Sequence, residues 1–277
     1  MRDEVTQHRF VLFDAAIVPI ESIRSLVDDG VCARCLYEQW GAGAERVSPW
    51  VLADGPGVRE LAQDMRASRT HAFGVSSLMS RVPMDELAEH LMRLQYLFCG
   101  HDRYFLRYAD GRAFADLWEV LRPEQRTCLL GPVQRWNARA CAPRDYMSGE
   151  SEDRLFGSGE GQRPPLRLMR AQFGRLIRAQ RITQRWAVWE TEQPLLARKF
   201  TPARLRDLAV GVGDWLQTHQ VVAGPTLRAV GMAALRSNGD VLESPDFPEA
   251  VAEHARKRET GEIRLEARQG QSSGAAA

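Results

Sequence analysis

The side chains that could do chemistry are few in this sequence and form no recognisable catalytic or metal-binding pattern. Cys32 and Cys35 make a single Cys-x-x-Cys pair, whereas a zinc site needs two further ligands at a matching spacing. The six histidines show no metal-ligand spacing, and no serine is set in the strand–turn–helix elbow of a hydrolase. We therefore expect no catalytic residue, no metal and no cofactor, and the cysteines are interpreted as small buried apolar residues.

One group of polar residues allows two interpretations. Arg107 interrupts a strand of large apolar residues predicted over 104–108, and a buried guanidinium needs a partner. Asp110 lies within local reach, so an Arg107–Asp110 or Arg112–Asp110 pair is expected to fix the turn into the next helix. The alternative is an enzyme with a cryptic site formed by His90 and these three residues. His90 falls on the apolar face of a predicted helix, which favours a hydrogen-bonded core histidine.

Basic residues are balanced over the whole chain but gather in one segment. The net charge is +1, and only two of the 37 basic residues are lysine. Between residues 163 and 206 there are 11 basic and 2 acidic residues. On a helix predicted from Leu166 to about Glu190, six arginines fall within an arc of about 140°. They are Arg167, Arg170, Arg175, Arg178, Arg181 and Arg185, and the neighbouring tryptophans are Trp186 and Trp189.

This arginine stripe has three possible meanings. It is either an ordinary solvated surface or a docking face for an acidic partner, with the two tryptophans as anchors. A nucleic-acid-binding module is the weaker third alternative, because the sequence holds no recognisable nucleic-acid motif. The neutral overall charge gives no case for a nucleic-acid or membrane binder.

The elements that must position these residues form two lobes. Strands alternating with helices over residues 1–147 predict an α/β (α+β) lobe with a mixed sheet and flanking helices. Residues 148–165 are rich in Ser, Gly and Pro and predict a linker or long loop. Residues 166–268 predict an all-α lobe, and residues 269–277 a disordered tail. Within the first lobe a helix is predicted over residues 84–97.

The compartment follows from what the sequence does not contain. No apolar run is long enough to cross a bilayer, and the N-terminal residues do not have the pattern of a signal peptide. Five cysteines, an odd number, are typical of reduced thiols. We expect a cytoplasmic protein.

Short motifs follow one another in a fixed order over residues 10–136. They are Phe10–Ala16 (FVLFDAA), Cys35–Tyr37 (CLY), Ser48–Leu52 (SPWVL), Phe73–Ser77 (FGVSS), Leu87–Arg93 (LAEHLMR), Phe105–Arg112 (FLRYADGR) and Leu130–Trp136 (LGPVQRW). In this order they resemble the bacterial type VI secretion effector adaptors, also called Tap or Tec chaperones. Ala109 and Gly111 depart from the family pattern, which usually has an aromatic residue and a proline at these positions.

The resemblance implies a cytoplasmic, non-enzymatic adaptor. Such proteins bind one toxic effector, the virulence cargo, and help to mount it on the VgrG spike or its PAAR tip. The implied partners are therefore a cognate effector and VgrG or PAAR, without a membrane and with nucleic acid unlikely. The family motifs place structural or binding residues at Pro49, Trp50, His90, Leu91, Arg107, Asp110, Arg112, Gly131 and Pro132. On this hypothesis the first lobe is the shared scaffold and the helical lobe recognises the particular cargo.

Overall fold

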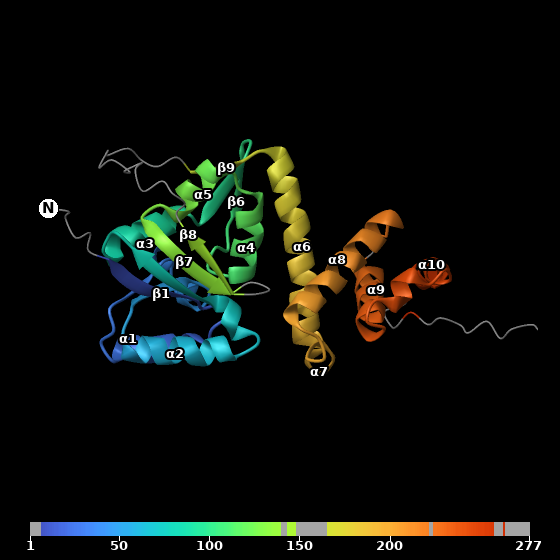
Figure 1. Cartoon of the computed structure of the whole chain (residues 1–277), viewed down its shortest axis with the longest axis horizontal. Coiled ribbons are helices and arrows are strands. Elements are labelled where there is room, and N and C mark those ends of the chain that lie inside the picture. The colour runs from blue at the N-terminus through green and yellow to red at the C-terminus, as the bar shows by residue number, and fades with distance from the viewer. Residues whose placement is uncertain (1–6, 140–142, 148–164, 222–223, 258–262, 264–277) are drawn as a thin grey trace, which may run out of the picture. The chain divides into compact units, whose positions relative to one another are not determined.

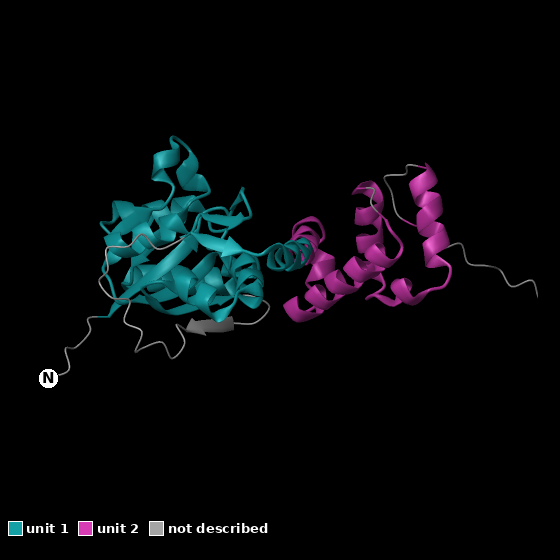
Figure 2. Ribbon diagram, turned by 90° about the horizontal axis from the view of Figure 1, so that it is seen from above, with its two compact units in different colours: residues 1–181 teal, residues 182–277 magenta. Residues whose placement is uncertain are grey.

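The chain divides into two compact units. The computed structural model describes residues 7–139, 143–147, 165–221, 224–257 and 263. The units are Met1–Arg181 and Ile182–Ala277, coloured separately in Figure 2. The division falls within helix α6 (Arg170–Glu192), later in the sequence than the linker expected at 148–165. Residues 148–164 of that linker and the tail expected at 269–277 lie outside the described residues.

A six-stranded sheet forms the centre of the first unit (Figure 1). In spatial order its strands are β2 (Ala33–Cys35), β3 (Pro49–Ala53), β1 (His8–Asp14), β4 (Val75–Ser80), β7 (Val133–Arg139) and β8 (Pro143–Met147). Every neighbouring pair is antiparallel. The apolar run of β1 is buried on both faces, since side chains alternate along a strand. Val11 and Phe13 enter one core cluster, and Phe10 and Leu12 enter the other.

Helices cover the two faces of this sheet (Figure 1). On one face lie α1 (Ile20–Asp28) and α2 (Pro56–Ala67), and on the other lie α3 (Met84–Arg93), α4 (Gly111–Val120) and α5 (Pro123–Leu130). The ring of Phe114 on α4 stacks on that of Trp136 on β7, with centroids 4.3 Å apart. Both side chains are fully buried, so this contact anchors α4 to the sheet.

A second, three-stranded sheet lies in the same unit. Its order is β6 (Asp102–Phe105), β5 (Tyr96–Cys99) and β9 (Leu166–Leu168). Strand β5 pairs antiparallel with β6 and parallel with β9, so this sheet is mixed. The predicted fold class of the first lobe, a mixed sheet with flanking helices, is confirmed.

Two element boundaries predicted from periodicity are wrong. The helix expected over 84–97 ends at Arg93, and the β-forming residues Tyr96–Cys99 make the central strand of the second sheet. The helix expected from Leu166 begins instead at Arg170, because Leu166–Leu168 pair with β5. In both places strand pairing outweighs the local helical pattern. The strand expected over 104–108 is also wrong in its bounds, because β6 ends at Phe105 and Arg107 follows it.

The second unit is helical, as predicted. After the end of α6 it contains α7 (Pro194–Ala197), α8 (Pro202–Thr218), α9 (Gly224–Arg236) and α10 (Phe247–Lys257). Thr201 caps the N-terminus of α8, because its hydroxyl accepts from the backbone N–H of Arg204 at 3.2 Å. Trp215 and Phe247 meet in its core with ring centroids 5.0 Å apart. Over the part of the chain that the structure describes, no helix is both long and apolar enough to cross a membrane.

Candidate functional site

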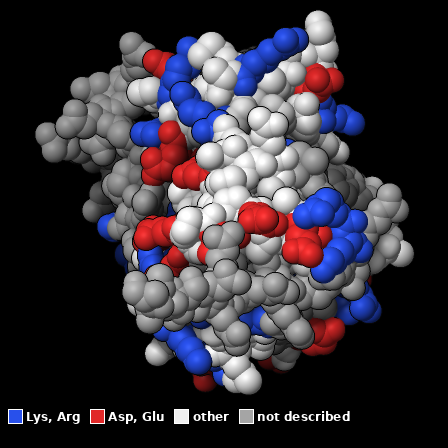
Figure 3. Space-filling model, turned by 90° about the vertical axis from the view of Figure 1, so that its right-hand side faces the viewer, with Lys and Arg blue, Asp and Glu red and all other residues white. Residues whose placement is uncertain are grey.

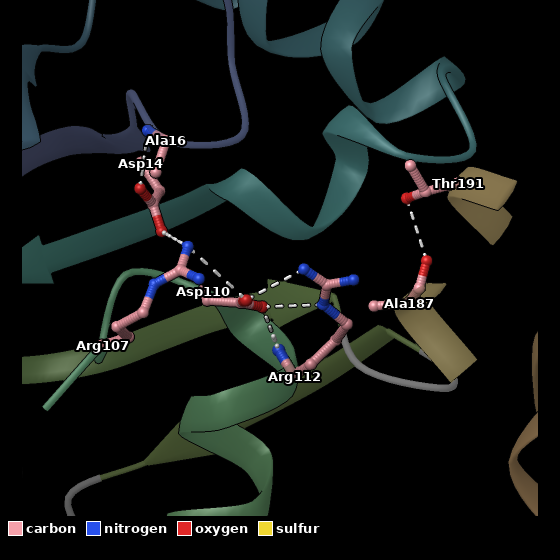
Figure 4. A network of polar contacts seen from close by, with 7 residues as sticks. All are labelled: Asp14, Ala16, Arg107, Asp110, Arg112, Ala187 and Thr191. Carbon is pink, nitrogen blue, oxygen red and sulfur yellow. Dashed lines mark hydrogen bonds and ion pairs between the residues drawn. The ribbon is translucent and has the colours of Figure 1, made fainter. Parts of the chain in front are cut away.

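Asp110 and Arg112 form a tight pair at the start of α4 (Figure 4). Asp110 is the N-cap of this helix, and its Oδ1 accepts from the backbone N–H of Arg112 at 3.0 Å. The Arg112 guanidinium also donates to both carboxylate oxygens, each at 2.9 Å, and lies 4.9 Å from the ring centroid of Phe73. Both side chains are largely buried, with 13% of the Arg112 side chain and 7% of the Asp110 side chain exposed. The predicted Arg112–Asp110 pair is therefore confirmed, and it fixes the turn into α4.

Arg107 connects this pair to the end of β1. Its Nη2 lies 3.0 Å from Oδ2 of Asp14 and 3.8 Å from Oδ2 of Asp110 (Figure 4). Asp14 also accepts from the backbone N–H of Ala16 at 2.9 Å. Burial raises the pKa of the Asp14 carboxyl, although Arg107 opposes that shift. Burial acts to lower the pKa of Arg107, but the Asp14 and Asp110 carboxylates outweigh it and raise that pKa.

Asp14 is the member of this network that the sequence did not identify as a partner. It lies 93 residues before Arg107, so no local pattern joins the two. The available signal was an aspartate that ends an apolar strand, since a buried carboxylate needs a partner. Each carboxylate of the network is already bonded to an arginine, which suits a structural clamp more than a base or a nucleophile.

His90 is not part of the polar network drawn in Figure 4. It is buried on α3, and its Nε2 donates to the backbone carbonyl of Leu129 on α5 at 3.0 Å. This is the core role that the sequence favoured over catalysis. The alternative enzyme site required His90 in one cleft with Arg107, Asp110 and Arg112, and the ion pairs of the structure join the last three.

The remaining family-motif residues make contacts within the fold. Pro49 is opposite Asp14 in the β1–β3 register, and the Trp50 indole N–H donates to the Glu45 carbonyl at 3.1 Å. Leu91 is fully buried. Gly131 follows α5 with a φ of 55°, a left-handed value that favours glycine. The Pro132 carbonyl accepts from the backbone N–H of Arg81 at 3.1 Å.

The close packing around Gly111 explains why glycine stands where the family usually has proline. A Cβ at this position would collide with the backbone carbonyl of Arg139 on β7 and lie 3.3 Å from the carbonyl oxygen of Phe73. The first turn of α4 therefore packs directly on the β7 backbone. Proline, which carries a Cβ, does not fit here without a shift of the strand, whereas glycine keeps the Asp110–Arg112 pair in place.

The arginine stripe is an exposed surface over part of its predicted length. Arg170, Arg175, Arg178 and Arg181 on α6 are exposed, and no described carboxylate forms an ion pair with any of them. We call these four the α6 arginine face. The buried side of the same helix is fixed by Gln172, whose Nε2 donates to the Val120 carbonyl at 2.8 Å. By contrast, acidic and basic side chains are mixed on the face of the molecule shown in Figure 3.

The other two arginines of the predicted stripe and the two tryptophans beside it are not part of the α6 arginine face. Arg167 is on β9, with its guanidinium 5.2 Å from the ring centroid of Phe98. Arg185 is half-buried, and its Nη1 lies 3.5 Å from the Ala209 carbonyl on α8. Trp186 and Trp189 are buried, with 0% and 4% exposed. The expectation that these tryptophans anchor a partner is therefore wrong, because they pack in the interior.

The described cysteines are not grouped with other side chains that ligate metals. No group of three or more His, Cys, Asp or Glu side chains there could hold an ion. Cys32, Cys35, Cys99 and Cys128 are free thiols. Cys99 is buried as expected, whereas Cys32 is exposed, which corrects its interpretation as a buried apolar residue. Cys141 lies outside the described residues.

Comparison with protein families finds a match, which lies in the first unit. Residues 10–128 match the model of a family described as Domain of unknown function (DUF4123). This family is known as the type VI secretion effector adaptor domain, also called Tec or Tap, and it is generally non-catalytic. Residues 10–128 therefore match this family, as the ordered motifs predicted. No curated protein and no solved structure matches the chain.

Proposed function

We propose that this protein binds one type VI secretion effector in the cytoplasm and helps to load it onto a VgrG or PAAR spike protein. The adaptor domain over residues 10–128 carries this proposal. The paired network of Asp14, Arg107, Asp110 and Arg112 gives it further support, since these charges stabilise the scaffold and are not arranged for turnover. The protein then acts by holding its cargo, without chemical change.

The α6 arginine face is the surface that we assign to the cargo. Its four guanidiniums are exposed, carry one sign of charge and are not neutralised by described carboxylates. A planar guanidinium binds carboxylates with two parallel hydrogen bonds, so an acidic surface of the effector is the matching chemistry. Because the buried Trp186 and Trp189 do not contribute, electrostatic complementarity would determine the orientation and the rate of association.

The test is co-purification with a type VI effector and a VgrG encoded beside this chain. We expect a stable complex with the unchanged protein. Simultaneous Arg170→Glu, Arg178→Glu and Arg181→Glu substitutions should weaken effector binding by about tenfold or more. The matched control reverses three exposed arginines elsewhere, Arg9, Arg122 and Arg198, and alters net charge equally.

Two outcomes would contradict the proposal at different levels. Folded protein that captures neither the effector nor VgrG would count against the adaptor function itself. Equal binding by the α6 variant and the control would retain the adaptor and return the α6 face to an ordinary solvated surface. Binding of single-stranded DNA that falls steeply with salt and is lost in the α6 variant would favour the nucleic-acid alternative.

A further inference from the structure

The three-stranded sheet has one buried face and one aromatic face. Leu97, Cys99, Leu166 and Leu168 are buried. Since side chains alternate along each strand, the residues between them point the other way. On that side the register places Tyr96 opposite Phe105, and Phe98 opposite both Arg103 and Arg167. Three aromatic rings and two arginines from β5, β6 and β9 therefore share one surface.

The two guanidiniums of this surface lie over its rings. The guanidinium carbon of Arg103 is 4.3 Å from the ring centroid of Tyr96, and that of Arg167 is 5.2 Å from the centroid of Phe98. Both arginines are exposed, and no described carboxylate pairs with either one. Stacking limits the freedom of each side chain while leaving its N–H groups available, which reduces the entropy lost on binding a carboxylate.

Trp40 extends the surface at one end. Its ring stacks on Tyr37 with centroids 4.6 Å apart and lies 5.4 Å from the ring of Phe105. Trp40 and Phe105 remain 45% and 46% exposed. Large aromatic side chains together with arginine are the residues most enriched at the centres of protein interfaces, and adjacent exposed rings mark a binding surface more than isolated ones do.

The backbone of β6 adds a second element of recognition. Among the described strands β6 pairs with β5 alone, so it is an edge strand. The backbone N–H of Leu106 donates to the Gln95 carbonyl at 2.8 Å. Hydrogen-bonded and non-hydrogen-bonded positions alternate in an antiparallel pair, so the backbone groups of Phe105 and Arg103 point away from β5. An open edge of this kind accepts a further strand.

We propose that this surface binds an extended segment of a partner protein that alternates apolar side chains with carboxylates. We call it the aromatic–arginine face, and it comprises Trp40, Tyr96, Phe98, Arg103, Phe105 and Arg167. The segment adds as a strand along β6, where one carboxylate pairs with Arg103 and its apolar side chains pack on Trp40 and Phe105. Where the segment continues across the face toward β9, a second carboxylate pairs with Arg167. This site is separate from the α6 arginine face and gives the protein a second docking surface.

A partner protein fits this surface better than nucleic acid does. Single-stranded nucleic acid needs a basic groove that follows the phosphates as well as rings for the bases to stack on. Only two arginines lie on this face. Two guanidiniums are too few to follow a run of phosphates, whereas a short acidic and apolar peptide needs only two.

The test uses a display library of random 12-residue peptides selected on the full chain. We expect selected sequences in which Asp or Glu alternates with Trp, Phe, Leu or Val. Fluorescence anisotropy of a labelled selected peptide should show at least about tenfold weaker binding to the Arg103→Glu, Arg167→Glu double variant. The Trp40→Ala variant should also bind more weakly. Arg59→Glu, at an exposed arginine on α2, should bind like the unchanged protein.

Several results would overturn the proposal. These are selection of no such peptide, binding unaffected by the double variant, or equal losses in the Arg59→Glu control. A labelled 20-residue oligothymidine that binds in a salt-dependent way and is lost in the double variant would assign the face to nucleic acid instead. Circular dichroism melting of every variant separates a lost surface from a lost fold. Effector co-purification by the double variant reports separately on the cargo function.

Discussion

Two sets of arginines in this protein differ in whether a carboxylate of the protein binds them. In the network at the end of β1 and the start of α4, Arg112 is bound by Asp110 through three hydrogen bonds, and Arg107 reaches Asp14. On the α6 arginine face, four guanidiniums are exposed and meet no described carboxylate. The first set stabilises the fold, and the second is available to another molecule.

The comparison shows that the partner, and not the residue type, decides what an arginine does. A buried guanidinium without a carboxylate is strongly destabilising, whereas an exposed one costs little because water solvates it. Removing a network carboxylate should therefore affect folding, and reversing the α6 charges should affect binding alone. The predictions below test this contrast, beginning with the largest expected change in stability.

Replacing Asp110 should have the largest effect. Asp110→Ala leaves the largely buried Arg112 guanidinium unpaired and removes the N-cap of α4, so we expect a loss of about 3–5 kcal/mol in unfolding free energy. Denaturant unfolding measures it. The matched control is Asp85→Ala, which breaks the exposed Arg34–Asp85 pair at 2.7 Å and should cost less than about 1 kcal/mol. Equal losses in the two variants would remove the distinction between buried and exposed pairs.

The turn that positions the network depends on Gly111. Gly111→Ala forces a Cβ against the Arg139 carbonyl, and we expect it to destabilise the protein by about 1–3 kcal/mol. Gly174→Ala on α6 is the control, because no atom lies within 4 Å of its added Cβ. It should stabilise the protein by up to about 1 kcal/mol. Thermal or denaturant unfolding of both variants is sufficient, and the same sign of change in both would be inconsistent with close packing at Gly111.

Asp14 should make stability depend on pH in an unusual direction. Its pKa in the folded protein is raised by burial, so the folded state holds this proton more tightly than the unfolded state does. Its contribution to stability is then present at low pH and is lost as pH rises from the ordinary carboxyl range through the raised pKa. An asparagine side chain at position 14 does not titrate in this pH range. The stability of Asp14→Asn relative to the unchanged protein should therefore increase over that interval.

Denaturant unfolding of both proteins at several pH values between about 4 and 7 measures this difference. Arg107 keeps Asp110 nearby in the variant, at 3.8 Å, and is itself half exposed. A relative stability that stays flat or falls as pH rises would show that ionised Asp14 is favoured in the fold, against the raised pKa.

The α6 substitutions should have the smallest effect on stability. Together, Arg170→Glu, Arg178→Glu and Arg181→Glu should change the unfolding free energy by no more than about 0.5 kcal/mol, as is usual for exposed positions. Arg170 is the first residue of the helix, where a negative charge is favourable. A loss as large as that of Asp110→Ala would show that these arginines belong to the fold, and the contrast between the two sets would fail.

Much of the architecture could be predicted from the sequence because it follows from local patterns. The mixed-sheet class of the first unit and the helical class of the second follow from such patterns. The Asp110–Arg112 pair is also local, since only Gly111 separates the two residues. Ordered motifs over residues 10–136 identified the adaptor family before any contact was known.

Residue patterns alone were enough to predict the class of fold, the family match over residues 10–128 and the local clamp at α4. The contacts of the folded chain were needed to show that Asp14 is the partner of Arg107, that Trp186 and Trp189 are interior, and that Arg167 lies on a strand. The reason is physical: helical periodicity records which residues share a face, but not what covers that face. Burial and strand pairing depend on residues far away in the chain. They determine whether an arginine stabilises the fold or is available to bind a partner.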